Sequence, residues 1–240
     1  MNLRIQYEPS WILHSRPFKE TSKIIDFITQ DHGRISLVAK GVRSRKSRLG
    51  GILRPFMPLN ISWSMRSDLG TLTGAENNGK AFALNGDAFF SGCYINELIL
   101  NLVHRHDPYP EVFSIYSEII RDLSLTNSLN SSLRYFEMEL LKLLGYALSL
   151  DHDSKTLGPI SMDKYYEYRI DEGTVETIKT GPMVFMGKHL IAISKYEFDC
   201  PEVLQCANRL LRYVMAYYLD GKAIKSRKVL KDIKEIEKNN

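Results

Sequence analysis

The sequence has few of the features that mark secreted or membrane-embedded chains. Its three cysteines, Cys93, Cys200 and Cys206, are too few and too scattered for a disulfide framework, which indicates a reducing compartment. No apolar run approaches the roughly eighteen residues of a membrane span. The first residues also lack the basic-then-apolar pattern of a secretory signal. We therefore expect a cytoplasmic protein that has no membrane partner.

Motifs that indicate an enzyme are missing as well. The sequence contains no GxxxxGK[ST] or GxGxxG phosphate loop and no GxSxG nucleophile elbow, and its cysteines form no CxxC pair. His104, His106 and Asp107 are ordinary metal ligands, but imidazoles at the end of a helix also interact favourably with its last carbonyls. We expect no catalytic residue, metal, cofactor or small-molecule substrate, and a metallohydrolase built on this string ranks third among the alternatives.

Acidic residues are absent from two long segments. The chain carries 32 basic and 28 acidic residues, yet no Asp or Glu lies between His32 and Ser67 or between Gly221 and Lys231. Clustered cations repel one another unless a polyanion neutralises them, so this segregation predicts a nucleic-acid partner. The cations of the first segment are Arg34, Lys40, Arg43, Arg45, Lys46, Arg48, Arg54 and Arg66, and those of the second are Lys222, Lys225, Arg227, Lys228 and Lys231.

Hydrophobic periodicity divides the chain into two parts. From Ser10 to Glu76 apolar residues recur with period two, which predicts five short strands and a small closed barrel. After Asn77 the spacing becomes helical, with a region over 151–198 that we expect to be irregular, and a charged tail. The fold class is therefore α+β, with domains over 1–77 and 78–240. The expected strands are 11–16, 23–29, 34–40, 59–65 and 69–74, the expected helices are 94–103, 110–123, 133–144 and 201–219, and further candidate strands are 165–170 and 184–193.

Four aromatic residues lie near the first basic segment in the sequence. Phe18, Phe27, Phe56 and Trp63 are candidates for stacking on bases, as small five-stranded barrels that bind single strands often do. Trp63 and Phe27 fall on the apolar rows of their strands. We therefore expect these two to be buried, and Phe18 to be the most exposed of the four.

Six segments match a known family in the right order along nearly the whole chain: LHSRPFKETS at 13–22, LVAKGVRSRKS at 37–47, LRPFMPL at 53–59, YINELI at 94–99, RYFEMELLKLLGYAL at 134–148 and GKAIKSRKVL at 221–230. Through these segments the sequence resembles the RecO family of bacterial recombination mediators. The family's zinc-binding members have four cysteines in the C-terminal half, which this chain lacks, so it is similar to the zinc-free subgroup. The resemblance implies an N-terminal OB-fold, a helical C-terminal domain, and binding of single- and double-stranded DNA. It also implies annealing of strands, including strands coated with the single-stranded-DNA-binding protein (SSB), and loading of RecA together with RecR in the RecF pathway.

We predict that the barrel and the basic tail form one cationic surface that holds DNA through its phosphates. Phosphate contacts position a strand and leave its base edges free. A protein-interaction adaptor that docks acidic partners and never binds DNA is the rival interpretation. The main predicted contacts are Lys40, Arg43, Arg45, Lys46 and Arg48, followed by Arg16, Lys19, Arg34, Lys225, Arg227 and Lys228.

A second predicted site would bind the SSB C-terminal tail, which is an acidic peptide that ends in an apolar residue. Such a peptide needs an apolar groove with a cation at its rim. We assign this role to Arg134, with Leu133 and Phe136 in the groove. The alternative is an ordinary helix arginine that pairs with Glu137 or another acid.

Overall fold

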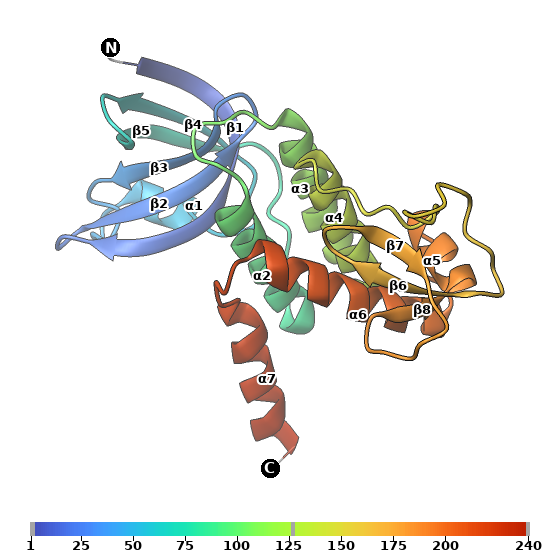
Figure 1. Ribbon diagram of the computed structural model, residues 1–240. Helices are drawn as coiled ribbons and strands as arrows, with labels where there is room; N and C mark the ends of the chain where they lie inside the picture. Colours follow the sequence, from blue (N-terminus) through green and yellow to red (C-terminus); the bar gives the residue numbers. More distant parts are fainter. Residues whose placement is uncertain (1–2, 126–127, 239–240) are drawn as a thin grey trace. The chain divides into compact units, whose positions relative to one another are not determined.

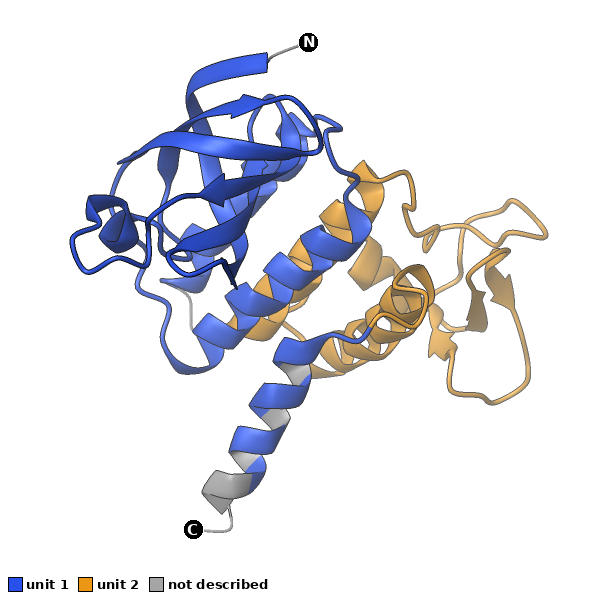
Figure 2. Cartoon of the chain, turned by 90° about the vertical axis from the view of Figure 1, so that its left-hand side faces the viewer, with its two compact units in different colours: residues 1–127, 223–240 blue, residues 128–222 orange. Residues whose placement is uncertain are grey.

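The computed structural model describes residues 3–125 and 128–238, without the side chains of 227, 231, 234 and 236–238. The chain forms two compact units (Figure 2): unit 1 consists of residues 1–127 and 223–240, and unit 2 of residues 128–222. Within the described residues, no helix has both the length and the apolar character that crossing a membrane requires.

Unit 1 is built around a closed five-stranded barrel (Figure 1). Its order is β1-β2-β3-β5-β4, and all neighbours are antiparallel except β3 and β5, as in an OB-like fold. All five expected strands are present, and the α+β class is confirmed. The first strand is longer than expected because its opposite halves pair with β4 and with β2, which closes the barrel. The strands are β1 (Leu3–Phe18), β2 (Ser22–Thr29), β3 (Gly33–Ala39), β4 (Leu59–Met65) and β5 (Leu69–Asn77).

The barrel interior is filled by every second residue of these strands. Phe27 and Trp63 are both fully buried in it, as the apolar rows predicted, and Phe56 is buried as well. Phe18 is half-buried at the end of β1, with the Lys19 ammonium 5.5 Å from its ring centroid. Of the four aromatic residues near the basic segment, Phe18 therefore has the most accessible ring.

Unit 1 also contains the short helix α1 (Arg48–Ile52) and three longer helices, α2 (Gly86–Leu102), α3 (Pro110–Leu123) and α7 (Lys225–Lys238). Polar groups fix α2 and α3 to the barrel, because Asn96 Nδ2 donates to the Leu13 carbonyl at 2.9 Å and the Tyr116 hydroxyl donates to Asn96 Oδ1 at 2.8 Å. The charged tail forms a helix rather than an extended end. Packing thus joins α2 and α3 to the barrel and α7 to α2. The predicted division at residue 77 follows the change of periodicity and stays a prediction.

Unit 2 combines helices with a small sheet. The sheet has the order β7-β6-β8, so the region 151–198 is more regular than we expected. The apolar run 184–193 is a strand only as far as Met186, because it then turns into a helix at Gly187, where a Cβ would lie 2.0 Å from the Ser161 carbonyl oxygen. The elements are α4 (Leu129–Leu143), β6 (Tyr165–Arg169), β7 (Gly173–Glu176), β8 (Val184–Met186), α5 (Gly187–Ser194) and α6 (Pro201–Tyr218).

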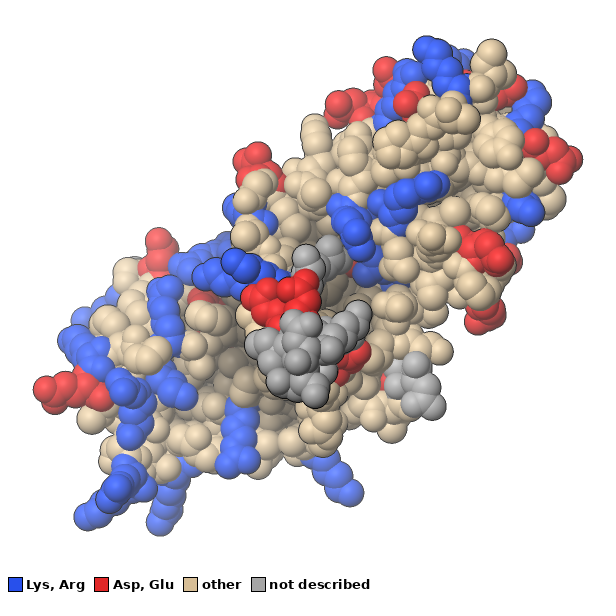
Figure 3. Space-filling model, turned by 90° about the horizontal axis from the view of Figure 1, so that it is seen from below, with Lys and Arg blue, Asp and Glu red and all other residues tan. Residues whose placement is uncertain are grey.

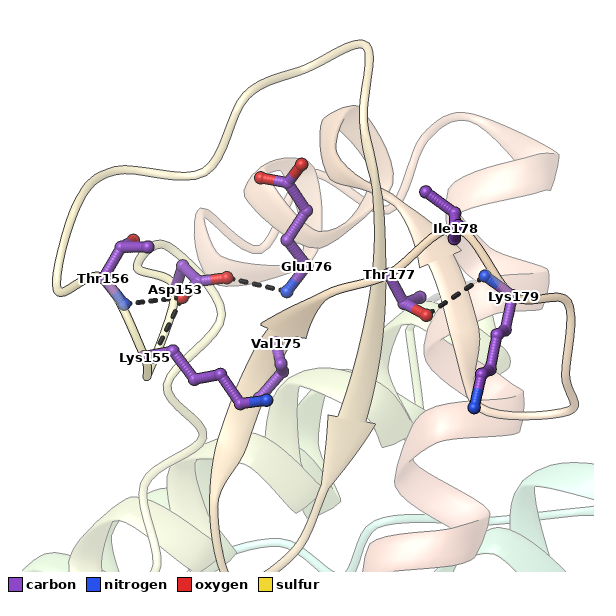
Figure 4. Close-up of a pocket in the computed structure, with 8 residues that line it drawn as sticks. All are labelled: Asp153, Lys155, Thr156, Val175, Glu176, Thr177, Ile178 and Lys179. Carbon is purple, nitrogen blue, oxygen red and sulfur yellow. Dashed lines mark hydrogen bonds between the residues drawn. The ribbon is translucent and has the colours of Figure 1, made fainter.

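A buried carboxylate organises the loop before this sheet (Figure 4). Asp153 Oδ1 accepts hydrogen bonds from the backbone N–H groups of Lys155 at 2.9 Å and Thr156 at 2.8 Å, and Oδ2 accepts one from Glu176 at 2.7 Å. Among the described residues, no three His, Cys, Asp or Glu side chains gather as a metal site requires. The loop is therefore tied to β7 by a hydrogen-bonded carboxylate.

We predict that Asp153→Ala lowers the free energy of unfolding of the chain by about 3 kcal/mol at neutral pH, since hydrogen bonds to a charged group contribute about 1.5 to 3 kcal/mol each and do not add fully. The bonds from Thr156, Glu176 and Lys155 hold the pKa of the Asp153 carboxyl below its ordinary value, against the opposing effect of burial. A lowered folded-state pKa stabilises the protein above the unfolded pKa of about 3.9, and this stabilisation is lost as the pH falls through the folded value.

Urea unfolding of the parent and Asp153→Ala at pH 7 and pH 3 tests this prediction. The difference between the two proteins should shrink at the lower pH. The exposed Asp163→Ala is the matched control and should behave as the parent at both pH values. Equal stabilities of Asp153→Ala and the control at pH 7 would contradict the structural role of Asp153.

Candidate nucleic-acid interface

Strand register brings several cations to one end of the barrel. Arg16 on β1 faces Ile24 on β2, and Lys23 faces Ala39, the last residue of β3. The turn between β1 and β2 and the segment after β3 are therefore neighbours. Lys19 in that turn and Lys40 after β3 are both exposed, so four cations from three strand ends share this part of the surface.

The basic loop, residues 40–48, lies beside the β1–β2 turn and is held to it. The side chain of Val42 is buried in the barrel core. The backbone N–H of Arg43 donates to the Thr21 carbonyl at 2.8 Å, and Arg43 Nη1 donates to the Lys19 carbonyl at 3.3 Å. The segment is thus a series of turns anchored to the barrel.

A short helix, α1 (Arg48–Ile52), follows the basic loop and packs back onto it. Ser47 caps this helix, since its Oγ accepts from the Gly50 N–H at 3.2 Å. Gly50 is needed because a Cβ there would lie 2.6 Å from the Val42 carbonyl oxygen. Leu53, just after the helix, is buried in the barrel core. The basic loop is therefore fixed at both ends.

The five cations of the basic loop are directed to solvent and have no acidic partner in the part of the chain that the structure describes. Each of their side chains is exposed, and the ion pairs formed by the described residues include none of them. Lys and Arg side chains project from the barrel on the face shown in Figure 3, with few Asp or Glu among them. This surface is suited to phosphates, which it can contact without breaking existing pairs. The five are Lys40, Arg43, Arg45, Lys46 and Arg48.

The outer face of β2 is closed to a ligand. Ile24, Asp26 and Ile28 alternate with the core residues of this strand and are nevertheless buried. Asp26 faces Arg105 from the segment after α2, with 3.7 Å between Oδ1 and Nη2. OB-folds often bind oligonucleotides on strands 2 and 3 and on the adjoining loops. Because the outer face of β2 is covered, the loops are the available part in this chain.

Arg34 differs from the other predicted contacts. It is half-buried, and its Nε donates to the carbonyl of Val103 at 3.1 Å, at the C-terminal cap of α2. Burial, and then the neighbouring Arg105, lower the pKa of the Arg34 guanidinium, and Asp26 opposes them. The geometry of Arg34 therefore favours a structural role in holding the end of α2 over phosphate contact, which the acid-free pattern in the sequence did not indicate.

The histidine string follows α2 and supports the same junction. The His106 N–H donates to the Arg34 carbonyl at 3.0 Å. Gly33, with a φ of +64°, permits this approach, because a Cβ there would lie 2.0 Å from the Asp107 carbonyl oxygen. His104, His106 and Asp107 are exposed, and it is the backbone of His106 that makes the contact to Arg34.

The basic tail is held by a carboxylate from α2. Glu97 accepts hydrogen bonds from the Ser226 N–H at 3.2 Å and from the Ser226 hydroxyl at 3.3 Å. Cations in the first turn of a helix oppose its dipole, and Glu97 supplies the anion that α7 lacks. Lys225 and Lys228 are exposed, whereas the side chain of Arg227 lies outside the described residues. No local signal marked Glu97, which is 129 residues from Ser226.

Arg134 is not at the rim of a groove. It is only 5% exposed, and its Nη2 lies 2.7 Å from Oε1 of Glu137, which is 0% exposed. Phe136 is buried and Leu133 is half-buried. The ion pair with Glu137 is the alternative that the sequence left open. The predicted role of these residues in peptide binding stays a prediction, and the exposed cation it requires is not present at Arg134.

Comparisons with known proteins cover both parts of the chain. The family model described as recombination protein O N terminal matches residues 6–78, and the model described as recombination protein O C terminal matches residues 84–228. The chain is 37% identical over 236 residues to the DNA repair protein RecO of Nitrosococcus oceani, covering 98% of this chain and 96% of that protein. It is 38% identical over 243 residues to the RecO of Dechloromonas aromatica, covering 98% and 100% of the two chains. The chain therefore belongs to the RecO family.

Proposed function

We propose that this protein binds single- and double-stranded DNA through the basic loop and the neighbouring β1–β2 turn, and that it anneals complementary strands. The proposal includes strands coated with SSB and, together with RecR, the loading of RecA in the RecF pathway. The single observation that carries it is the cluster of five exposed basic-loop cations that have no acidic partner among the described residues. A cytoplasmic, nucleoid-associated location is part of the same proposal.

Membership in the RecO family makes this chain a DNA-binding protein of DNA repair and recombination. Proteins of this family act as recombination mediators. Annealing needs no covalent chemistry. A surface of exposed cations that contacts phosphates, as at this interface, can therefore support it. The proposal also covers how much each unit contributes to DNA binding and where RecR and SSB bind.

The mechanism follows from the repulsion between two polyanionic strands. Lys40 and the cations that follow it can neutralise phosphates of both strands and release their condensed counterions. Further exposed cations add to the positive charge of unit 1, namely Arg16, Lys19 and the tail residues Lys225 and Lys228. Phosphate contacts carry no sequence information and leave base edges free to pair. The barrier to encounter falls while pairing itself is unchanged.

Annealing of SSB-coated complementary oligonucleotides, with and without this protein, tests the proposal. We expect acceleration that weakens with salt. If about six cations contact a single strand, the logarithm of the affinity should fall against the logarithm of the salt concentration with a slope of about −4. An adaptor that docks acidic proteins predicts no acceleration and no binding of a labelled oligonucleotide by fluorescence anisotropy. A slope near zero would contradict the phosphate mechanism.

A further inference from the structure

A pocket of about 500 Å³ lies in unit 1, apart from the basic loop. It is lined by β1, the turn after β2, the segment that follows β5, and one side of α3. Its wall includes the rings of Phe82 and Phe113, which are both half-buried and so keep part of their surface accessible. Concave sites with apolar walls and a few convergent polar groups are the usual form of a ligand site.

The walls of this pocket are held in place by contacts that do not use its interior. Trp11 Nε1 donates to the Ser117 hydroxyl at 2.9 Å and fixes the indole against α3. The Phe82 ring is tilted beside this indole, with centroids 6.0 Å apart and an interplanar angle of 33°. The Phe82 N–H donates to the Phe56 carbonyl at 3.1 Å. The aromatic wall is therefore organised before any ligand arrives.

The polar residues at the pocket narrow the chemistry of the ligand. The amide side chains of Gln30 and Asn78 are exposed, and amides recognise the mixed donors and acceptors of a base edge. Lys80 and Arg121 are exposed cations that suit a phosphate, while the carboxylate of Glu118 repels a ligand with several negative charges. A planar, neutral, hydrogen-bonding ring with one adjacent phosphate fits these residues better than an acidic peptide does.

We propose that this pocket holds one unstacked base of a bound DNA strand, with the base against Phe82 and Phe113 and its phosphate near Lys80 and Arg121. This inference rests on the proposed function, because it assumes that DNA is bound at the basic loop. Lys23 at one end of β2 and Gln30 beyond its other end are seven residues apart, or about 23 Å at the rise of a strand. A strand must therefore span several nucleotides to reach both sites.

The test fills the pocket without removing a contact that holds its walls. Ser114 is exposed, and its hydroxyl bonds only the Pro110 carbonyl one turn earlier among the described contacts, so Ser114→Phe places a ring in the pocket at little structural cost. Glu111→Phe, on the same helix but outside the lining, is the matched control. We expect Ser114→Phe to bind a labelled twenty-nucleotide thymidine oligonucleotide about tenfold more weakly, since one stacked base contributes about that factor.

The salt dependence separates this site from the basic loop. Ser114→Phe should keep the parent's salt slope, because it removes stacking and no phosphate contact. Arg121→Ala should lower the magnitude of the slope by about 0.7 and serves as the second variant if Ser114→Phe does not fold. A three-nucleotide oligonucleotide, too short to reach both sites, should bind the parent and Ser114→Phe equally.

Photocross-linking gives a readout that altered stability does not produce. An oligonucleotide with 5-iododeoxyuridine should cross-link to the peptides that contain Phe82 or Phe113. Parent-like binding by both pocket variants, with no cross-link to these peptides, would overturn the pocket assignment while leaving the basic-loop proposal intact. Failure of the parent itself to bind the oligonucleotide would instead overturn the proposed function. Loss in Ser114→Phe of binding to a synthetic peptide of four aspartates and a phenylalanine, with oligonucleotide affinity unchanged, would assign the pocket to a protein partner and overturn the inference.

Discussion

Replacement of Arg43, Arg45 and Lys46 by glutamate is expected to weaken single-stranded DNA binding at least about 100-fold at 0.1 M salt. Each phosphate contact on a single strand contributes about 0.7 to the salt exponent, so three lost contacts amount to about two orders of magnitude relative to 1 M salt. Repulsion by the new carboxylates adds to this loss. The salt slope should fall in magnitude by about 2, and annealing of complementary strands should be abolished.

The fold should tolerate this triple variant. All three side chains are exposed, and among the described residues they make one hydrogen bond, from Arg43 to the Lys19 carbonyl. Changes at such positions usually alter stability by about 0.5 kcal/mol or less. Thermal unfolding of parent and variant should therefore nearly coincide. A variant that melts like the parent and still anneals strands would exclude the basic loop as the DNA-binding surface.

A matched charge reversal in unit 2 separates local contact from net charge. Lys155, Lys179 and Lys195 are exposed, and none of them forms an ion pair with another described residue. Their replacement by glutamate changes the net charge by the same amount as the triple variant does. Because exposed charges are screened beyond about 8 to 10 Å at physiological salt, we expect this control to retain most of the parent's affinity and its salt slope. Equal losses in the two variants would show that overall charge, and not the basic loop, governs binding.

Arg134→Ala is expected to lower the free energy of unfolding by about 3 to 5 kcal/mol. The substitution removes the guanidinium that lies 2.7 Å from the fully buried Glu137 carboxylate. A buried carboxylate that loses its cationic partner retains the cost of leaving water without the compensating attraction. The loss is to be measured by urea unfolding followed by circular dichroism. The urea concentration at the midpoint should fall, while the dependence of the unfolding free energy on urea concentration (the m-value) should change little.

The double variant Arg134→Met/Glu137→Met tests the cause of this loss. Replacing both charges with apolar side chains of similar length should restore most of the stability, since a buried pair often contributes little net free energy relative to apolar packing. Lys142→Ala is the surface control, because Lys142 pairs with Glu139 on the same helix at 3.4 Å while remaining exposed. Its effect should not exceed about 0.5 kcal/mol. An Arg134→Ala protein as stable as this control would contradict the buried pair.

The expected instability of Arg134→Ala affects how peptide binding can be assigned to unit 2. Any loss of SSB-tail binding in Arg134→Ala would coincide with destabilisation, so a reduced signal alone would not place the peptide at Arg134. Peptide binding by the double variant is the informative measurement. Normal affinity there would show that the charge of Arg134 does not contact the peptide.

Local patterns in the sequence were sufficient for much of this molecule. Period-two spacing predicted the five strands, and the apolar rows placed Phe27 and Trp63 inside the barrel. Pro110 marked the start of α3, as a residue suited to the first helical turn. The absence of Asp and Glu between His32 and Ser67 predicted the exposed cations of the basic loop. Alternation, helix termini and charge segregation are properties of neighbouring residues, so a sequence displays them directly.

Tertiary structure alone decided which cations are free and which hold the fold together. Arg34 is held by a carbonyl 69 residues away, and Ser226 of the basic tail by Glu97, 129 residues away. Arg134 and Glu137 are one helical turn apart, yet the packing around α4 determines that their pair is buried. In the sequence every arginine carries the same charge, whatever its surroundings in the folded protein. Its availability to a phosphate depends on burial and on partners that chain folding brings from distant positions, which is why the sequence predicted the charge of this surface but not the role of each cation.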